Sequence, residues 1–65
     1  MLQRMRIDEF FTKVSHLPQV HLVQRTPTAC VLRCGSRHVR LGLWAIREFT
    51  WERLALGLQL PLASR

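Results

Sequence analysis

The sequence predicts a small α+β domain, in which an N-terminal helix and a C-terminal helix accompany a three-stranded antiparallel sheet. Three observations lead to this class. Apolar residues recur at helical spacing near the N-terminus, they alternate with other residues around a Gly-Ser pair, and strong helix formers follow a threonine near the C-terminus. The whole chain, 1–65, is expected to form one domain, because 65 residues are too few for two.

The first expected element is a helix over 7–17. Its apolar stripe recurs at intervals of three and four residues: Ile7, Phe10, Phe11, Val14 and Leu17. Asp8 and Glu9 lie near its N-terminus, where negative charge is favourable. Pro18 prevents the helix from continuing.

The second expected element is a strand over 19–25, rich in β-branched residues. Apolar and polar residues alternate until Val23, which predicts either burial on both faces or a β-bulge. The Thr-Pro-Thr segment 26–28 then predicts a turn, since Pro27 has no N–H to donate to a ladder.

A hairpin is the centre of the predicted fold, with strands over 29–34 and 37–44. Gly35-Ser36 fits a two-residue type II′ loop, because Gly adopts a positive φ without steric cost. This loop pairs Cys34 with Arg37, Leu32 with Val39, Cys30 with Leu41 and Thr28 with Leu43. Those residues share one largely apolar face, which is expected to cover the core. The opposite face carries Ala29, Val31, Arg33, His38, Arg40, Gly42 and Trp44.

Residues 45–60 support two interpretations. Leucines recur with period two from Leu54 onward, which is a strand pattern. The same region contains strong helix formers, with Thr50 as a candidate N-cap and Glu52 in the first turn. We favour a helix over 50–59, in which Trp51, Leu54, Ala55 and Leu58 form one stripe.

The net charge of +6 favours polyanionic or acidic partners: nucleic acid, an acidic protein or an anionic membrane. The cations are spread along the chain rather than gathered in a run. Apolar residues make up 48% of a chain too short to bury them all, so a homodimer is expected.

Metal and catalytic chemistry are disfavoured by the same hairpin. Cys30, Cys34 and His38 have the spacing C-x3-C-x3-H. In an extended strand the two cysteines are roughly 13 Å apart, too far to share a zinc ion, and His38 points to the other face. No metal, cofactor or catalytic residue is predicted, and we expect no enzymatic activity.

Two functional hypotheses remain. The first is a small nucleic-acid-binding regulatory or accessory protein that uses the outward face of the hairpin, with Arg25, Arg33, Arg37, His38, Arg40 and Trp44 as candidate contacts. The alternative is a protein-interaction module, such as a small inhibitor, antirepressor or regulatory subunit, with Trp51, Leu56 and Leu60 as candidate contacts.

The location is predicted to be cytoplasmic, with reduced thiols. The N-terminus reaches charge within four residues and has no apolar run typical of a secretory signal. No apolar stretch approaches the ~18 residues of a membrane span, so no membrane association is expected.

Overall fold

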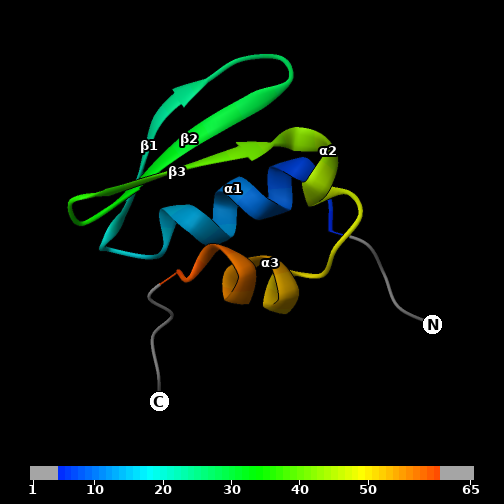
Figure 1. Cartoon of the computed structure of the whole chain (residues 1–65). Coiled ribbons are helices and arrows are strands. Elements are labelled where there is room, and N and C mark those ends of the chain that lie inside the picture. Colours follow the sequence, from blue (N-terminus) through cyan, green and yellow to red (C-terminus); the bar gives the residue numbers. More distant parts are fainter. Residues whose placement is uncertain (1–4, 61–65) are drawn as a thin grey trace.

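A computed structural model describes residues 5–60 as an antiparallel sheet packed on three helices (Figure 1). The elements, in chain order, are α1 (Ile7–Ser15), β1 (Val20–Arg25), β2 (Ala29–Cys34), β3 (Arg37–Gly42), α2 (Leu43–Ile46) and α3 (Trp51–Leu58). The strands lie in the order β1-β2-β3. The predicted α+β class, with its N-terminal helix, three-stranded sheet and C-terminal helix, is confirmed.

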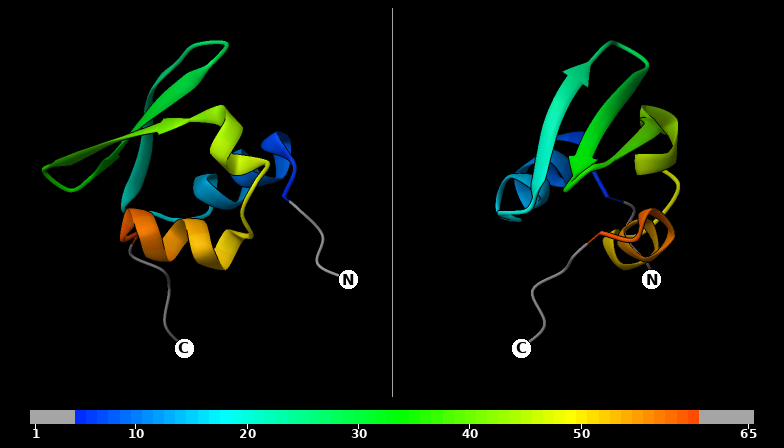
Figure 2. Two further views of the ribbon diagram at one scale, coloured as in Figure 1. Left: turned by 45° about the vertical axis from the view of Figure 1, so that its right-hand side comes forward. Right: turned by 60° about the vertical axis from the view of Figure 1, so that its left-hand side comes forward.

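The helices lie on one side of the sheet (Figure 2), and the core fills the space between the helices and the sheet. Phe10 of α1, Leu32 of β2 and Ile46 of α2 are completely excluded from solvent. Cys30 is buried beside them, with 1% of its surface exposed. No element within residues 5–60 covers the opposite side of the sheet, which we call the open face (Figures 1 and 2).

The central hairpin has the predicted register. Gly35 has a φ of +65°, and Ser36 is not among the residues with positive φ, as a type II′ turn requires. Cys34 lies opposite Arg37, and Leu32 opposite Val39.

The last strand is shorter than predicted. The expected strand over 37–44 ends at Gly42, so Trp44 belongs to α2 and not to β3. The Leu43 N–H still donates to the Thr28 carbonyl at 2.9 Å, and the chain then turns helical. The helical turn buries both Leu43 and Ile46, which are three residues apart. In a continued strand these two side chains would point to opposite faces of the sheet, and only one of them could be buried.

A β-bulge interrupts β1, as one of the two interpretations of Val23 predicted. Leu22 pairs with Leu32 and Gln24 pairs with Val31, so Val23 is the extra residue. Burial on both faces is wrong, because Val23 is 53% exposed.

The helical interpretation of the C-terminal segment is confirmed, and the strand alternative is wrong. The Thr50 hydroxyl accepts a hydrogen bond from the Arg53 backbone N–H at 3.3 Å, as expected of an N-cap. Gln59 adopts the left-handed conformation with φ 56°, and the Leu60 N–H donates to the Ala55 carbonyl at 2.9 Å. This arrangement closes the helix and returns Leu60 to the core. Within the described part of the chain, no helix is long and apolar enough to cross a membrane.

Candidate functional site

The open face is built from alternate residues of the three strands, arranged in rows by the strand register. The first row is His21, Arg33 and His38, next to the Gly35-Ser36 turn. The second row is Gln24, Val31 and Arg40, and the third is Ala29 and Gly42. Two residues along a strand span roughly 6.6 Å, so the first and third rows are roughly 13 Å apart.

Charge is segregated between the sheet and the helix layer. No aspartate or glutamate occurs between Glu9 and Glu48 in the sequence, so the strands carry none. Asp8 and Glu9 lie in the first turn of α1, Glu48 follows α2, and Glu52 lies in the first turn of α3. Arg33 and Arg40 therefore make the open face positively charged, with no carboxylate beside them on the sheet, and such a surface attracts anions.

Trp44 joins the open face by a route that the sequence did not predict. A Cβ atom added to Gly42, on the side facing away from the core, would lie 2.5 Å from Nε1 and 2.7 Å from Cδ1 of Trp44. The indole therefore folds back from α2 over Gly42, and only glycine leaves room for it there. Trp44 is 68% exposed. The indole thus occupies the third row, at the opposite end of the open face from Arg33 and the two histidines.

Two of the predicted contact residues lie on the covered side of the sheet: Arg37, as the predicted pairing with Cys34 requires, and Arg25, which was expected to join the open face. The bulge at Val23 reverses the alternation, so Arg25 pairs with buried Cys30 and its Cζ lies 4.3 Å from the centre of the Phe11 ring. Arg37 donates from one guanidinium nitrogen to the Leu58 carbonyl at 3.1 Å and from the other to the Gln59 carbonyl at 2.8 Å. The open face keeps Arg33, His38, Arg40 and Trp44 of the predicted set.

The structure adds His21 to the predicted set. His21 lies directly opposite Arg33 on the neighbouring strand. The signal was present in the alternation of 20–22, but the sequence alone gave no register between β1 and β2.

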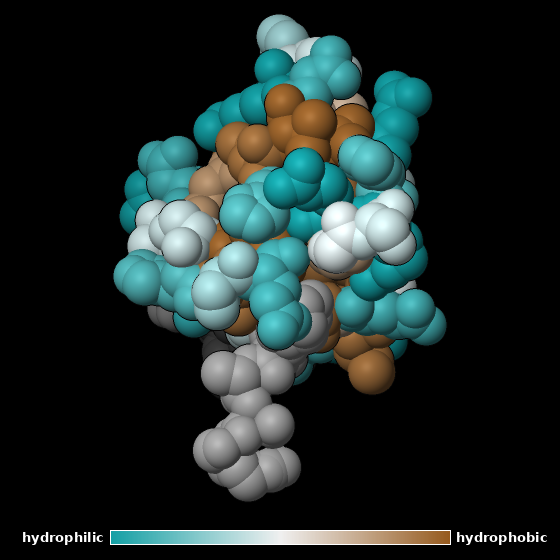
Figure 3. Space-filling model, turned by 90° about the vertical axis from the view of Figure 1, so that its left-hand side faces the viewer, coloured by the Kyte–Doolittle hydropathy of each residue, from teal (hydrophilic) through white to brown (hydrophobic). Residues whose placement is uncertain are grey.

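The three residues predicted to contact a partner protein are separated by the fold. Trp51 packs against Phe10, with ring centres 5.8 Å apart, and Leu60 is buried. Leu56 is 80% exposed. The sheet contributes further exposed apolar surface through Leu22 and Val23, and Figure 3 shows an apolar area bordered by hydrophilic residues in the upper, sheet-bearing part of the molecule.

The two cysteines are free and lie on the covered side of the sheet. Burial raises the pKa of the Cys30 thiol, and the positive charge of Arg25 opposes this shift only in part. Among residues 5–60 there is no group of three or more His, Cys, Asp or Glu side chains that is arranged to hold a metal ion.

The chain matches no model of a known protein family, no curated protein and no solved structure. The geometry and charge of the open face are therefore the basis on which a function is proposed.

Proposed function

We propose that this protein is a small, non-enzymatic nucleic-acid-binding protein with a regulatory or accessory role, and that it binds a single strand across the open face. The observation that carries the proposal is the position of the exposed Trp44 indole over Gly42, on the same face as Arg33 and Arg40. Guanidinium groups neutralise phosphates, and an exposed indole stacks on an unpaired base.

A single strand suits this surface better than a duplex. Base stacking on Trp44 requires a base that is not already stacked and paired within a double helix. A two-stranded ribbon fits a major groove about 12 Å wide, whereas here a third strand and its side chains broaden the surface.

The test is fluorescence anisotropy with labelled 12-residue DNA and RNA single strands and with a duplex of equal length, at several salt concentrations. We expect salt-sensitive binding with the single strands preferred. Arg33→Ala and Arg40→Ala should each weaken binding and reduce the slope of log K against log salt by about 0.7, the value for one phosphate contact on a single strand.

Arg53→Ala is the matched control, because Arg53 is equally exposed but lies on α3 in the helix layer. It should leave the salt slope unchanged. Absence of salt-sensitive binding to any oligonucleotide at low ionic strength would overturn the proposal, and so would equal effects of Arg40→Ala and Arg53→Ala.

A cytoplasmic location is part of the proposal, in keeping with the two free thiols. A homodimer is also part of it. Leu54 and Leu60 are buried, so a dimer contact through the C-terminal helix would centre on the exposed Leu56. Sedimentation equilibrium tests this, because Leu56→Glu should convert a dimer into a monomer of 7.6 kDa.

The second candidate function is binding of an acidic protein partner. It is favoured by large apolar residues that are exposed, namely Leu22 and Val23 on the edge strand β1 and Leu56 on α3. A partner that remains bound to the protein after nuclease treatment, and that Leu22→Asp releases while Arg40→Ala does not, would favour this candidate over nucleic-acid binding.

A further inference from the structure

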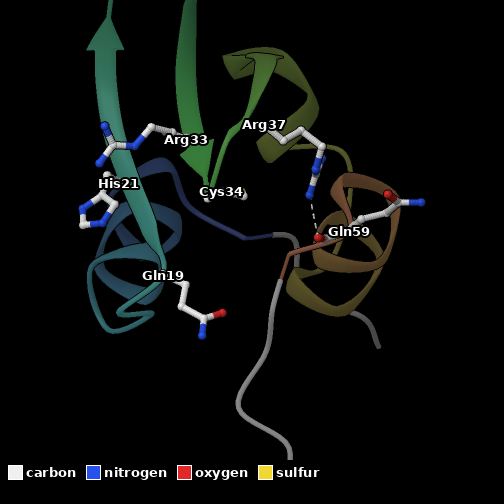
Figure 4. Close-up of a pocket in the computed structure, with 7 residues that line it drawn as sticks. Gln19, His21, Arg33, Cys34, Arg37 and Gln59 are labelled. Carbon is white, nitrogen blue, oxygen red and sulfur yellow. Dashed lines mark hydrogen bonds between the residues drawn. The ribbon is translucent and has the colours of Figure 1, made fainter.

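A hollow of ≈ 500 Å³ lies at one end of the open face, between the start of β1, the β2–β3 turn and the C-terminal end of α3 (Figure 4). Its polar lining consists of Gln19, His21, Arg33, Arg37 and Gln59, with the Cys34 thiol at its back. The size lies in the range of small-ligand sites, roughly 300–1,000 Å³.

The lining is rich in hydrogen-bond donors, and among residues 5–60 it contains no carboxylate. Arg33 and Arg37 are the two permanent cations among the described lining residues, and their side chains extend in opposite directions, Arg33 toward β1 and Arg37 toward α3 (Figure 4). The nearest acid on α3 is Glu52, which lies in the first turn, at the opposite end of the helix from Gln59. An anion is therefore the ligand that the hollow favours.

Arg37 is held in place before any ligand arrives. Its hydrogen bonds to the Leu58 and Gln59 carbonyls fix the plane of the guanidinium and use two of its five N–H groups, which leaves three donors. The carbonyl end of α3 carries partial negative charge, which offsets part of the charge on Arg37. Strong anion binding in the hollow consequently needs Arg33 as well.

His21 and Arg33 belong both to the hollow and to the first row of the open face. A strand lying along the face from Trp44 past Arg40 therefore reaches the hollow at its end. A terminal phosphate monoester carries about −1.5 to −2 charges near pH 7, more than the single charge of an internal phosphodiester, and gains more from a lining of cations and hydrogen-bond donors. We propose, resting on the proposed function, that the hollow binds the terminal phosphate of a nucleic-acid strand whose following nucleotides lie on the open face.

The experiment compares three unlabelled 12-residue single strands of one sequence, with a 5′-phosphate, with a 3′-phosphate or with hydroxyl groups at both ends. Each strand competes with a labelled strand for the protein. We expect one of the phosphorylated strands to bind about tenfold more tightly than the hydroxyl-ended strand, as a few charge-assisted hydrogen bonds would give.

Gln19→Glu and Gln24→Glu form a matched pair of variants. Both positions are exposed, so both variants are expected to fold, and thermal melting followed by circular dichroism checks this. Gln19→Glu places a negative charge in the hollow and should abolish the preference for the phosphorylated end. Gln24→Glu places the same charge on the open face outside the hollow and should weaken binding of all three strands alike.

Equal affinity for the three strands would overturn the terminal-phosphate site while leaving the proposed function intact, because the hydroxyl-ended strand tests that function alone. A preference that survives Gln19→Glu would also overturn the site. A nucleoside monophosphate is the last probe: if it binds while no strand binds, the hollow accepts a free nucleotide and the strand-end assignment is wrong, together with the proposed function.

Discussion

The two faces of the sheet are made by the same three strands, yet they differ in almost every physical property. Leu32, Cys30 and Leu41 point into the helix layer and are buried, whereas Arg33, His38 and Arg40 alternate with them and are exposed. The covered face provides the apolar contacts that hold the domain together. The open face has no role in that core, so its residues are available for binding. In so small a chain, alternation along a strand separates the residues that stabilise the domain from those proposed to bind a ligand.

The strongest test of this separation compares two neighbours on β2. Leu32 is fully buried on the covered face, whereas Val31 is half-buried on the open face. Leu32→Ala removes a core side chain and leaves a cavity, so we expect it to lower the free energy of unfolding by about 2–5 kcal/mol. Since small domains are only marginally stable, this variant should unfold at a much lower urea concentration than the wild type.

Val31→Ala is the control, and it should cost less than about 1 kcal/mol, because the lost methyl groups are only partly removed from water. Urea unfolding followed by circular dichroism measures both changes. Equal losses for the two variants would contradict the division of the sheet into a structural and a binding face.

The next test compares the two tryptophans. Trp44 is exposed over Gly42, and Trp51 packs edge-on against Phe10. Trp44→Ala should weaken single-strand binding by about 1–3 kcal/mol, the contribution of one stacked base, with little effect on folding. In Trp51→Phe the remaining fluorescence comes from Trp44 and should be quenched when a strand binds.

Gly42→Ala tests the position of the Trp44 indole without removing the ring. The new Cβ would lie 2.5 Å from the Trp44 indole nitrogen, so the ring must move from its position over Gly42. Gly42→Ala should therefore reduce binding, but by less than Trp44→Ala does, because the indole is still present. Normal binding by Gly42→Ala would show that the position of the indole over Gly42 does not matter.

The covered face also gives a pH dependence. Burial raises the pKa of the Cys30 thiol above its value in the unfolded chain, so above about pH 8.5 the folded state holds a proton that the unfolded state releases. The stabilisation is complete below that pH and is lost as the pH rises toward the folded pKa, with a slope of at most about 1.4 kcal/mol per pH unit. Urea unfolding between pH 7 and 10 should show this slope in the wild type and a shallower one in Cys30→Ala. Parallel pH curves for the two proteins would refute it.

Local sequence signals were sufficient for most of the fold. Gly35 predicts the register of the hairpin, and Thr50 predicts the start of α3. Pro27 predicts the turn that separates β1 from β2. In each of these, one residue type dictates the backbone conformation or satisfies a specific backbone group. The period-two leucines were misleading, because a helix can present Leu54 and Ala55 to the core while Leu56 stays exposed.

The parts that could not be predicted depend on contacts between distant segments. The bulge at Val23 was one of two alternatives, and its effect on Arg25 required the pairing with β2. The four-residue helix α2 is too short for a periodic signal, so the alternation of β3 was extended to Trp44. The partnership of Arg37 with the end of α3 joins residues more than twenty positions apart. The geometry of the candidate site was therefore predicted in part: Arg33, His38 and Arg40 share one face as expected, whereas Arg25 lies on the other side of the sheet.

The smallest expected effect comes from two arginines three residues apart on β3. Arg37 donates to two carbonyls at the end of α3, whereas Arg40 lies on the open face. Arg37→Ala leaves those carbonyls to water, and because the side chain is exposed we expect a loss of only about 1 kcal/mol. Arg40→Ala should change stability by less than about 0.5 kcal/mol. Arg37→Lys should recover only part of the loss, because an ammonium group lacks the planar fork that reaches both carbonyls.

Hydrogen exchange distinguishes a local effect from a global one. In Arg37→Ala the backbone amides of α3 should exchange faster while those of α1 keep their protection, because the contact joins the hairpin turn to α3 alone. Uniform loss of protection across both helices would mean that Arg37 stabilises the whole core. The side chains of Arg37 and Arg40 have the same chemistry and differ only in the side of the sheet on which they lie. An equal loss of stability in Arg37→Ala and Arg40→Ala would therefore contradict the distinction between the two faces.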